Sequence, residues 1–98
     1  MDDVYYHPEK IGLDLIGDVE WSDEPYEFDM TAVWQDPTTR GIYYADDSGC
    51  SCPSPFENFH TRDDLTCATK AQVIAHLRSR GALKAESLID RVRALPIH

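Results

Sequence analysis

The chain has 98 residues, of which 42% are hydrophobic, and this size and composition suit one domain with a single modest core. Its formal net charge of −9 and its thinly spread lysines and arginines disfavour direct nucleic-acid binding, because phosphate contacts need clustered basic side chains. No apolar run approaches the length of a membrane span, and the N-terminus is acidic where a secretory signal is basic, so we expect a cytoplasmic protein without membrane association.

Charge is divided unevenly along the chain. Residues 1–64 hold 16 acidic and 3 basic side chains, whereas residues 65–98 hold 2 acidic and 6 basic ones. One interpretation is solubility together with attraction between the two parts, within one molecule or between two. The other is an acidic face that meets a basic partner.

The first half of the chain predicts β-strands. Apolar residues alternate with acidic ones over residues 11–21 and again over 26–34, the period-two pattern of strands with one wet face. A helix is the competing prediction for the first segment, but Gly12 and Gly17 disfavour it. A returning strand at 42–45 completes an antiparallel meander of three strands. The apolar residues of the first strand that share one parity are Ile11, Leu13, Leu15, Val19 and Trp21.

The last third of the chain predicts two helices. Thr69 has the position of an N-cap, and Gln72 that of its capping-box partner. Gly81 is predicted to end the first helix as a left-handed cap. A second helix is expected over about residues 83–95, where Pro96 stops it.

These elements predict an α+β fold in which a three-stranded antiparallel meander is packed on one face by a C-terminal helical hairpin. Residues 1–98 are expected to form a single domain. Its sheet part spans about 11–45, a cysteine- and proline-rich loop 46–60, and the helical part about 61–95.

The loop contains the most unusual chemistry of the chain. It is predicted to turn at Asp47-Ser48-Gly49, to present two cysteines one residue apart, and to be held extended by two prolines. The odd number of cysteines prevents complete pairing within the chain, and Cys50 and Cys52 are too close for an ordinary disulfide. We therefore interpret all three cysteines as free thiols or metal ligands.

Zinc is one hypothesis for these thiols. Three thiolates and an imidazole satisfy tetrahedral zinc, and a metal stabilises a small domain. The spacing departs from the usual paired cysteines, so the hypothesis depends on residue types. The candidate ligands are Cys50, Cys52, His60 and Cys67.

A cysteine-dependent enzyme is a remote alternative. His60, oriented by Asp63 or Asp64, is placed to activate a thiol, and Cys67 precedes a helix whose dipole would lower its pKa. No known Cys–His signature matches the sequence around Cys50, so we expect no enzyme activity. The aspartate pairs are interpreted as turn formers and dipole-compensating charges.

Aromatic side chains suggest a binding surface beside the loop. Tyr43 and Tyr44 are adjacent and must point to opposite faces of a strand, so one of them lies outside the core that the helices cover. An aromatic patch rimmed by acid is typical of partner surfaces, although the loop folding back over the ring is an equal alternative. The predicted surface residues are Tyr43, Tyr44, Asp46, Asp47, Cys50, Cys52, Phe56 and Phe59.

The segments Tyr26-Glu27-Phe28-Asp29-Met30 to Trp34 and Tyr43 to Glu57 resemble a family of small uncharacterised proteins of actinobacteria and their bacteriophages. The resemblance is clearest over residues 26–57 and weaker over 61–77. Its most specific string is Gly49-Cys50-Ser51-Cys52-Pro53-Ser54-Pro55-Phe56-Glu57. It implies a phage or actinobacterial origin and no particular activity or cofactor.

The favoured hypothesis is a small, acidic, non-enzymatic protein, phage-encoded and active in the host cytoplasm, that binds a protein partner. That partner is expected to be basic and host-encoded. Binding would use the acidic sheet face and the 48–59 loop, with charge steering the encounter and aromatic groups supplying affinity. No cofactor is expected, zinc being the alternative, and a homodimer is left open.

Overall fold

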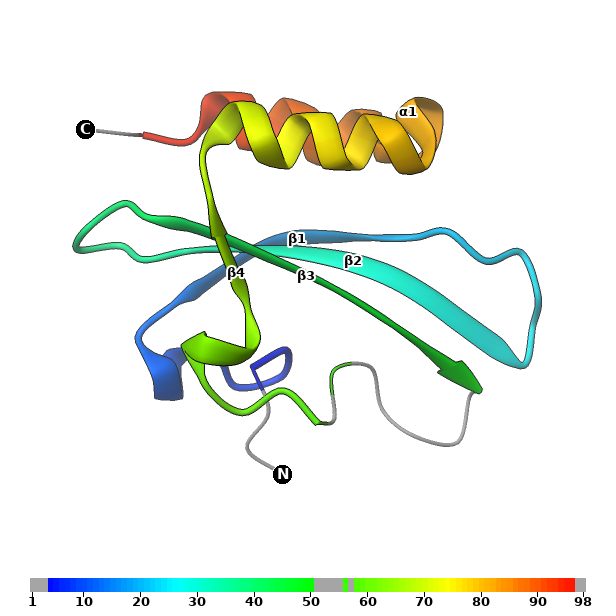
Figure 1. The fold of residues 1–98 in the computed structure, drawn as a ribbon, viewed down its shortest axis with the longest axis horizontal. Helices are drawn as coiled ribbons and strands as arrows, with labels where there is room; N and C mark the ends of the chain where they lie inside the picture. Colours follow the sequence, from blue (N-terminus) through cyan, green and yellow to red (C-terminus); the bar gives the residue numbers. More distant parts are fainter. Residues whose placement is uncertain (1–3, 51–55, 57, 97–98) are drawn as a thin grey trace.

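The computed structural model describes residues 4–50, 56 and 58–96. Its centre is a four-stranded antiparallel sheet, with a helix above it and a less regular layer below it (Figure 1). In chain order the elements are η1 (Pro8–Ile11), β1 (Asp14–Glu20), β2 (Glu27–Gln35), β3 (Ile42–Cys50), η2 (Arg62–Asp64), β4 (Thr66–Ala68) and α1 (Lys70–Ala94).

The prediction of three strands is wrong. A short fourth strand, β4, pairs with the start of β3, with Cys67 opposite Tyr43. Three residues are too few to show the alternation of apolar and polar residues that indicates a strand, so the sequence did not predict β4. The expected turn at residues 47–49 is also wrong, because β3 continues through it to pair with the start of β2, Cys50 lying opposite Glu27. Pairing overrides the local turn preference of these residues.

The prediction of a hairpin of two separate helices is wrong as well. A single helical element, α1, spans Lys70–Ala94, with a kink at Gly81, whose backbone is extended rather than left-handed. At the kink α1 bends back, so that its first arm (70–80) and its second arm (82–94) lie side by side (Figure 1). The ammonium of Lys70 accordingly donates to the carbonyl of Arg93 at 2.7 Å.

Two sequence features explain where α1 starts and bends. The capping box is confirmed, because the Thr69 hydroxyl accepts from the Gln72 backbone and the Gln72 side chain accepts from the Thr69 backbone. A Cβ at Gly81 would lie 3.1 Å from the ring of Trp21, so glycine permits a close approach to the sheet. No helix within the described residues combines the length and the apolar character that crossing a membrane requires.

A β-bulge in β1 divides the apolar residues that were expected to share one face. The register with β2 shifts between Leu15 and Gly17. Leu15 therefore packs below the sheet, whereas Val19 and Trp21 pack against α1. One extra residue reverses the side-chain parity, which a period-two pattern does not reveal.

β2 is buried on both faces. Val33 packs under α1, together with Val73 and Leu77. Phe28 and Trp34 lie on the opposite face of β2. The prediction that the helices cover the alternating apolar residues of this strand is therefore wrong. Their cover consists of the N-terminal segment and residues from the region 56–65, which lie below the sheet (Figure 1).

Phe56 is the centre of the lower layer. Its side chain is 0% exposed and its ring contacts those of Trp34, Tyr5 and Phe59 at centroid distances of 5.6, 5.4 and 5.3 Å. Its φ of 61° is left-handed, and its backbone N–H donates to the Asp47 carboxylate at 2.7 Å. Aromatic packing and this hydrogen bond together stabilise a left-handed backbone conformation that residues other than glycine rarely adopt.

A second set of contacts ties three segments of the lower layer together. The guanidinium of Arg62 donates to the Asp36 carboxylate at 2.6 Å and to the carbonyls of Ile11 and Gly12. Asp36 also accepts from the backbone of Thr38 and Thr39 in the β2–β3 turn. The hydrogen bond from Arg62, followed by those two backbone donors, lowers the pKa of Asp36 from 3.8 to about 2.

Substitution of Phe56 tests the lower layer. We expect Phe56→Ala to lower the free energy of unfolding by about 3–5 kcal/mol, because it leaves a cavity among three aromatic rings. Tyr26→Ala, at a side chain that is 78% exposed, is the control and should change stability by less than about 0.5 kcal/mol. Urea denaturation measures both, and an equally small effect of the two substitutions would contradict burial of Phe56.

Acid stability tests the contact between Arg62 and Asp36. Because the folded pKa of Asp36 is lower than its ordinary value, this carboxylate stabilises the fold above about pH 4, and the contribution is lost as the pH falls toward about 2. Asp36→Asn should reduce the loss of stability in this pH window. Asp90→Asn, at a carboxylate on the outer side of α1, should leave it unchanged in denaturation measured across the same range.

Candidate functional site

The described members of the predicted surface lie in different parts of the fold. Tyr44 faces α1, where its ring lies 4.6 Å from that of His76. Tyr43 packs against the lower layer, with the Arg62 guanidinium 5.8 Å from its ring centroid. Phe56 is buried and packs against Trp34, Tyr5 and Phe59 instead of lying on an open face. Phe59 packs beside it, and Cys52 lies outside the described residues.

The acidic residues of the sheet that face α1 are paired within the molecule. Arg80 contacts Asp29 at 2.5 Å and Asp46 at 3.4 Å, and His76 contacts Asp46 at 2.8 Å. The hydrogen bond to Asp29 raises the pKa of the Arg80 guanidinium. The attraction between the acidic and basic parts of the chain thus acts within one molecule, and α1 covers much of the sheet face that was expected to be open.

This cluster continues into the interface between α1 and the sheet. The indole N–H of Trp21 donates to the Thr31 hydroxyl at 2.9 Å, and that hydroxyl donates to Asp46. The Arg80 guanidinium lies 5.2 Å from the Trp21 ring centroid. Within the described part of the chain, no buried side-chain nitrogen or oxygen lacks a hydrogen-bond partner. The buried polar atoms of the cluster are therefore all hydrogen-bonded, as expected of a structural network.

The candidate zinc ligands are not brought together among the described residues. Cys67 lies opposite Tyr43, and Cys50 lies seven residues further along β3. At about 3.3 Å per residue this separation is roughly 23 Å, whereas zinc–sulfur bonds are about 2.3 Å long. The described residues contain no group of three histidine, cysteine or carboxylate side chains placed to hold a metal ion.

A thiol–imidazole pair is also not formed in the described region. No hydrogen bond there joins Cys50 or Cys67 to a histidine, and both thiols are exposed. His60 donates its backbone N–H to Asp64, which also accepts from the backbone of Thr61, and these bonds lower the pKa of Asp64. Asp64 thus caps η2.

The two edges of the sheet differ. Along β1 and its ends, basic side chains cover the backbone: Lys84 donates to the Trp21 carbonyl, Arg91 to that of Ile16 and Arg62 to those of Ile11 and Gly12. The bulge distorts the same strand. Covered carbonyls and a bulge are both devices that protect an edge from pairing with another strand.

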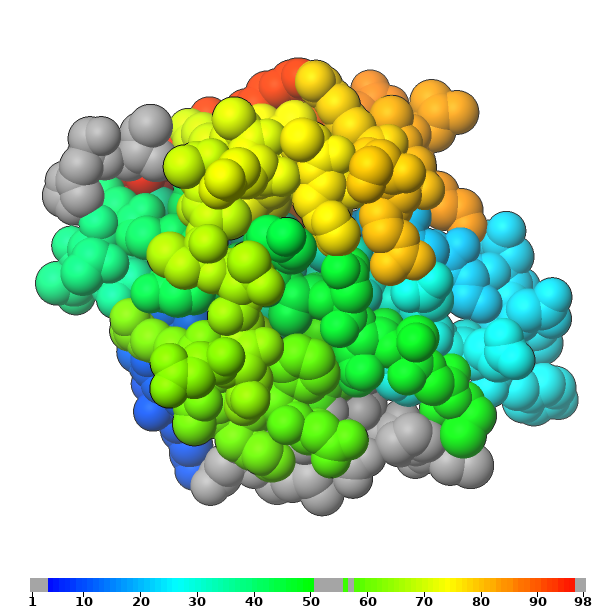
Figure 2. Space-filling view, in the orientation of Figure 1, coloured from blue at the N-terminus to red at the C-terminus, as the bar shows by residue number. Residues whose placement is uncertain are grey.

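The outer edge of β3 is not protected in this way. β4 pairs only with Ile42–Tyr44, and no described residue forms a backbone hydrogen bond with the outward groups of residues 45–50. In Figure 2 the green band of β3 reaches the surface between α1 and the segment before β4. We call residues 45–50 of this strand the β3 outer edge. Sequence analysis missed it, because β3 was expected to end at Ala45.

A shallow hollow adjoins this edge. It has a volume of about 430 Å³ and is lined by the ends of β2 and β3, including Glu27, Asp29, Ser48 and Cys50. Asp29 is paired with Arg80, whereas Glu27 is exposed. The hollow therefore combines backbone at the end of a sheet with acidic and small polar side chains, and its chemistry suits a polar or basic segment.

Comparison with known proteins identifies a family. The family described as Domain of unknown function (DUF7574) matches residues 2–94, far more of the chain than the 26–57 segment in which resemblance was clearest. No curated protein and no solved structure matches the chain. The expectation of an uncharacterised family is confirmed at this level.

Zinc analysis of two variants tests the separation of the thiols. Cys67 on β4 lies opposite Tyr43, seven residues along β3 from Cys50. We therefore expect Cys67→Ser to leave both the metal content of purified protein and its melting temperature in chelator unchanged. Cys50→Ser is the matched variant. Equal loss of bound zinc in both variants, accompanied by lower melting temperatures, would contradict the separation.

Proposed function

The chain belongs to the DUF7574 family, whose description assigns no activity, and we propose that it is a non-enzymatic protein-binding module that pairs an extended, basic partner segment with the β3 outer edge. This mode of recognition adds a strand to a sheet. Backbone hydrogen bonds supply affinity, and alternate side chains of the added strand supply specificity.

The single observation that carries the proposal is the shortness of β4. It ends the pairing of β3 at Tyr44, although β3 runs on to Cys50 beside β2. Alternate N–H and C=O groups of a strand point away from its neighbour, so the β3 outer edge offers donors and acceptors to a further strand. The protected edge at β1 does not compete for the same segment.

Charge supports a basic partner. Residues 1–64 carry a large acidic excess, and the ion pairs with Arg62, Arg80 and Lys84 compensate only part of it. Glu27 is exposed beside the hollow. A negative field raises the association rate of basic segments and weakens as salt is added.

The origin suggested by residues 26–57 supports a cellular setting for this partner. The string Gly49–Glu57, which resembles actinobacterial and phage proteins, begins at the end of the β3 outer edge. A phage-encoded module that acts in the bacterial cytoplasm would meet a host protein there. The partner is therefore proposed to be a basic, host-encoded protein with an extended segment.

Peptide titration followed by NMR tests the proposal. The probe is a short peptide of alternating lysine and valine, with an alternating glutamate and valine peptide as its charge control. We expect the basic peptide to slow amide hydrogen exchange within residues 46–50, and its affinity to fall as ionic strength rises. A version N-methylated at alternate residues should bind more weakly, because it lacks half of its backbone donors.

Two matched variants sharpen the test. Ser48→Lys places a cation on the β3 outer edge and should weaken binding of the basic peptide by about fivefold at low ionic strength. Ser87→Lys places the same cation on α1 and should have a smaller effect. Equal effects of the two variants, or protection confined to residues outside 45–50, would overturn the proposal.

A further inference from the structure

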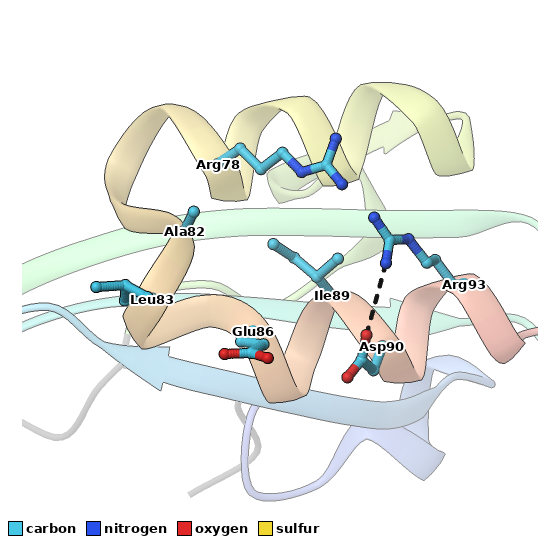
Figure 3. Close-up of a pocket in the computed structure, with 7 residues that line it drawn as sticks. All are labelled: Arg78, Ala82, Leu83, Glu86, Ile89, Asp90 and Arg93. Carbon is cyan, nitrogen blue, oxygen red and sulfur yellow. Dashed lines mark ion pairs between the residues drawn. The ribbon is translucent and has the colours of Figure 1, made fainter.

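A groove lies between the two arms of α1, on the side that faces away from the sheet. It encloses about 270 Å³ (Figure 3). Ala82 and Ile89 contribute apolar surface to it, and Leu83 lies at its end with 89% of its side chain exposed. An exposed leucine beside a groove that contains apolar side chains is typical of a contact surface between proteins.

Charges of both signs line this groove. Arg78 on the first arm and Arg93 on the second reach toward each other over Ile89 (Figure 3). Glu86 and Asp90 lie beside them on the second arm, and only the exposed contact of 3.6 Å between Asp90 and Arg93 joins two of these four groups. The surface is therefore neutral in sum and contains both partners of a charge pair.

We propose that this groove is the contact surface between two copies of the chain, related by a two-fold axis. Such an axis brings the same patch of each copy together, so a patch must be complementary to itself. Leu83 of each copy would enter the groove of the other, and Arg78 of each copy would face Glu86 of the other. Opposite charges on one patch fit this arrangement.

The overall charge favours this surface over others for self-association. A net charge of −9 makes two copies repel each other, and the repulsion is smallest where basic residues gather. All six lysines and arginines of residues 65–98 lie on α1, together with only two acidic residues. Four of these basic side chains, Lys70, Arg80, Lys84 and Arg91, contact the sheet or the other arm. On the outer side, Arg78 and Arg93 are balanced by Glu86 and Asp90, so two copies that meet at the groove bring together surfaces without net charge.

The size of the surface predicts a weak dimer. Each arm of α1 is roughly 18 Å long at 1.5 Å per residue, and two arms side by side are about 20 Å wide. This face is smaller than the roughly 800 Å² that each partner buries in a standard interface. We expect a dissociation constant in the micromolar range or weaker. The inference is independent of the proposed function, because the β3 outer edge stays free in such a dimer.

Sedimentation velocity over a wide range of protein concentration tests the dimer. We expect the weight-average mass to rise from that of the monomer toward that of the dimer. Leu83→Glu should raise the dissociation constant at least about tenfold, because it removes the apolar contact and adds charge. Tyr26→Glu replaces another highly exposed side chain, an aromatic one that does not line the groove, and should have little effect.

A charge exchange tests the pairing itself. Arg78→Glu and Glu86→Arg should each weaken the dimer, whereas the double variant should return the dissociation constant to within about threefold of the original. A chain that stays monomeric at millimolar concentration overturns the proposal. So does a dimer that Leu83→Glu leaves intact, or a double variant no stronger than the weaker single one.

Discussion

The burial of β2 on both of its faces is the constraint on which the structure depends. Val33 on one face and Trp34 on the other are both completely buried, so the sheet needs a cover on each side. Among the described residues, α1 is the only α-helix available for this purpose. The second cover is therefore built from segments with little regular secondary structure, which specific side-chain contacts hold in place. Phe56 supplies the apolar part of that layer, and Arg62 links its segments through carbonyl and carboxylate groups.

The uneven charge of the sequence acquires a structural meaning in this arrangement. α1 brings Arg80 and Lys84 onto the acidic sheet region, where they contact Asp29 and Asp23. These pairs are partly exposed and each contributes little to stability alone, but they orient α1 on the sheet. The apolar side chains buried between α1 and the sheet contribute most of the free energy that holds α1 in place. Ion pairs thus accompany the apolar contacts that hold α1 on the sheet.

Sequence patterns predicted the elements that depend on local signals. They did not predict the features that depend on contacts between residues distant in the sequence. Alternation located β1 and β2, the connection after β2 placed the start of β3, and the capping box located the start of α1. The bulge in β1, the three-residue β4 and the extension of β3 depend on register with other strands, which no local pattern contains. Phe56 was expected in an aromatic patch on the open face of the sheet. Its burial depends on contacts with Trp34 and Tyr5, which are distant from it in the sequence.

The open length of β3 follows from the lower layer as well. An extension of β4 along β3 would place Leu65 opposite Ala45 and Asp64 opposite Asp46. Leu65 is instead buried beneath the sheet, and residues 62–64 form η2. η2 is held by the cap that Asp64 provides and by the contact of Arg62 with Asp36, so the preceding chain cannot move alongside the strand. The contacts that complete the second cover of β2 thereby also determine where β4 begins, and with it how much of β3 is left for another strand.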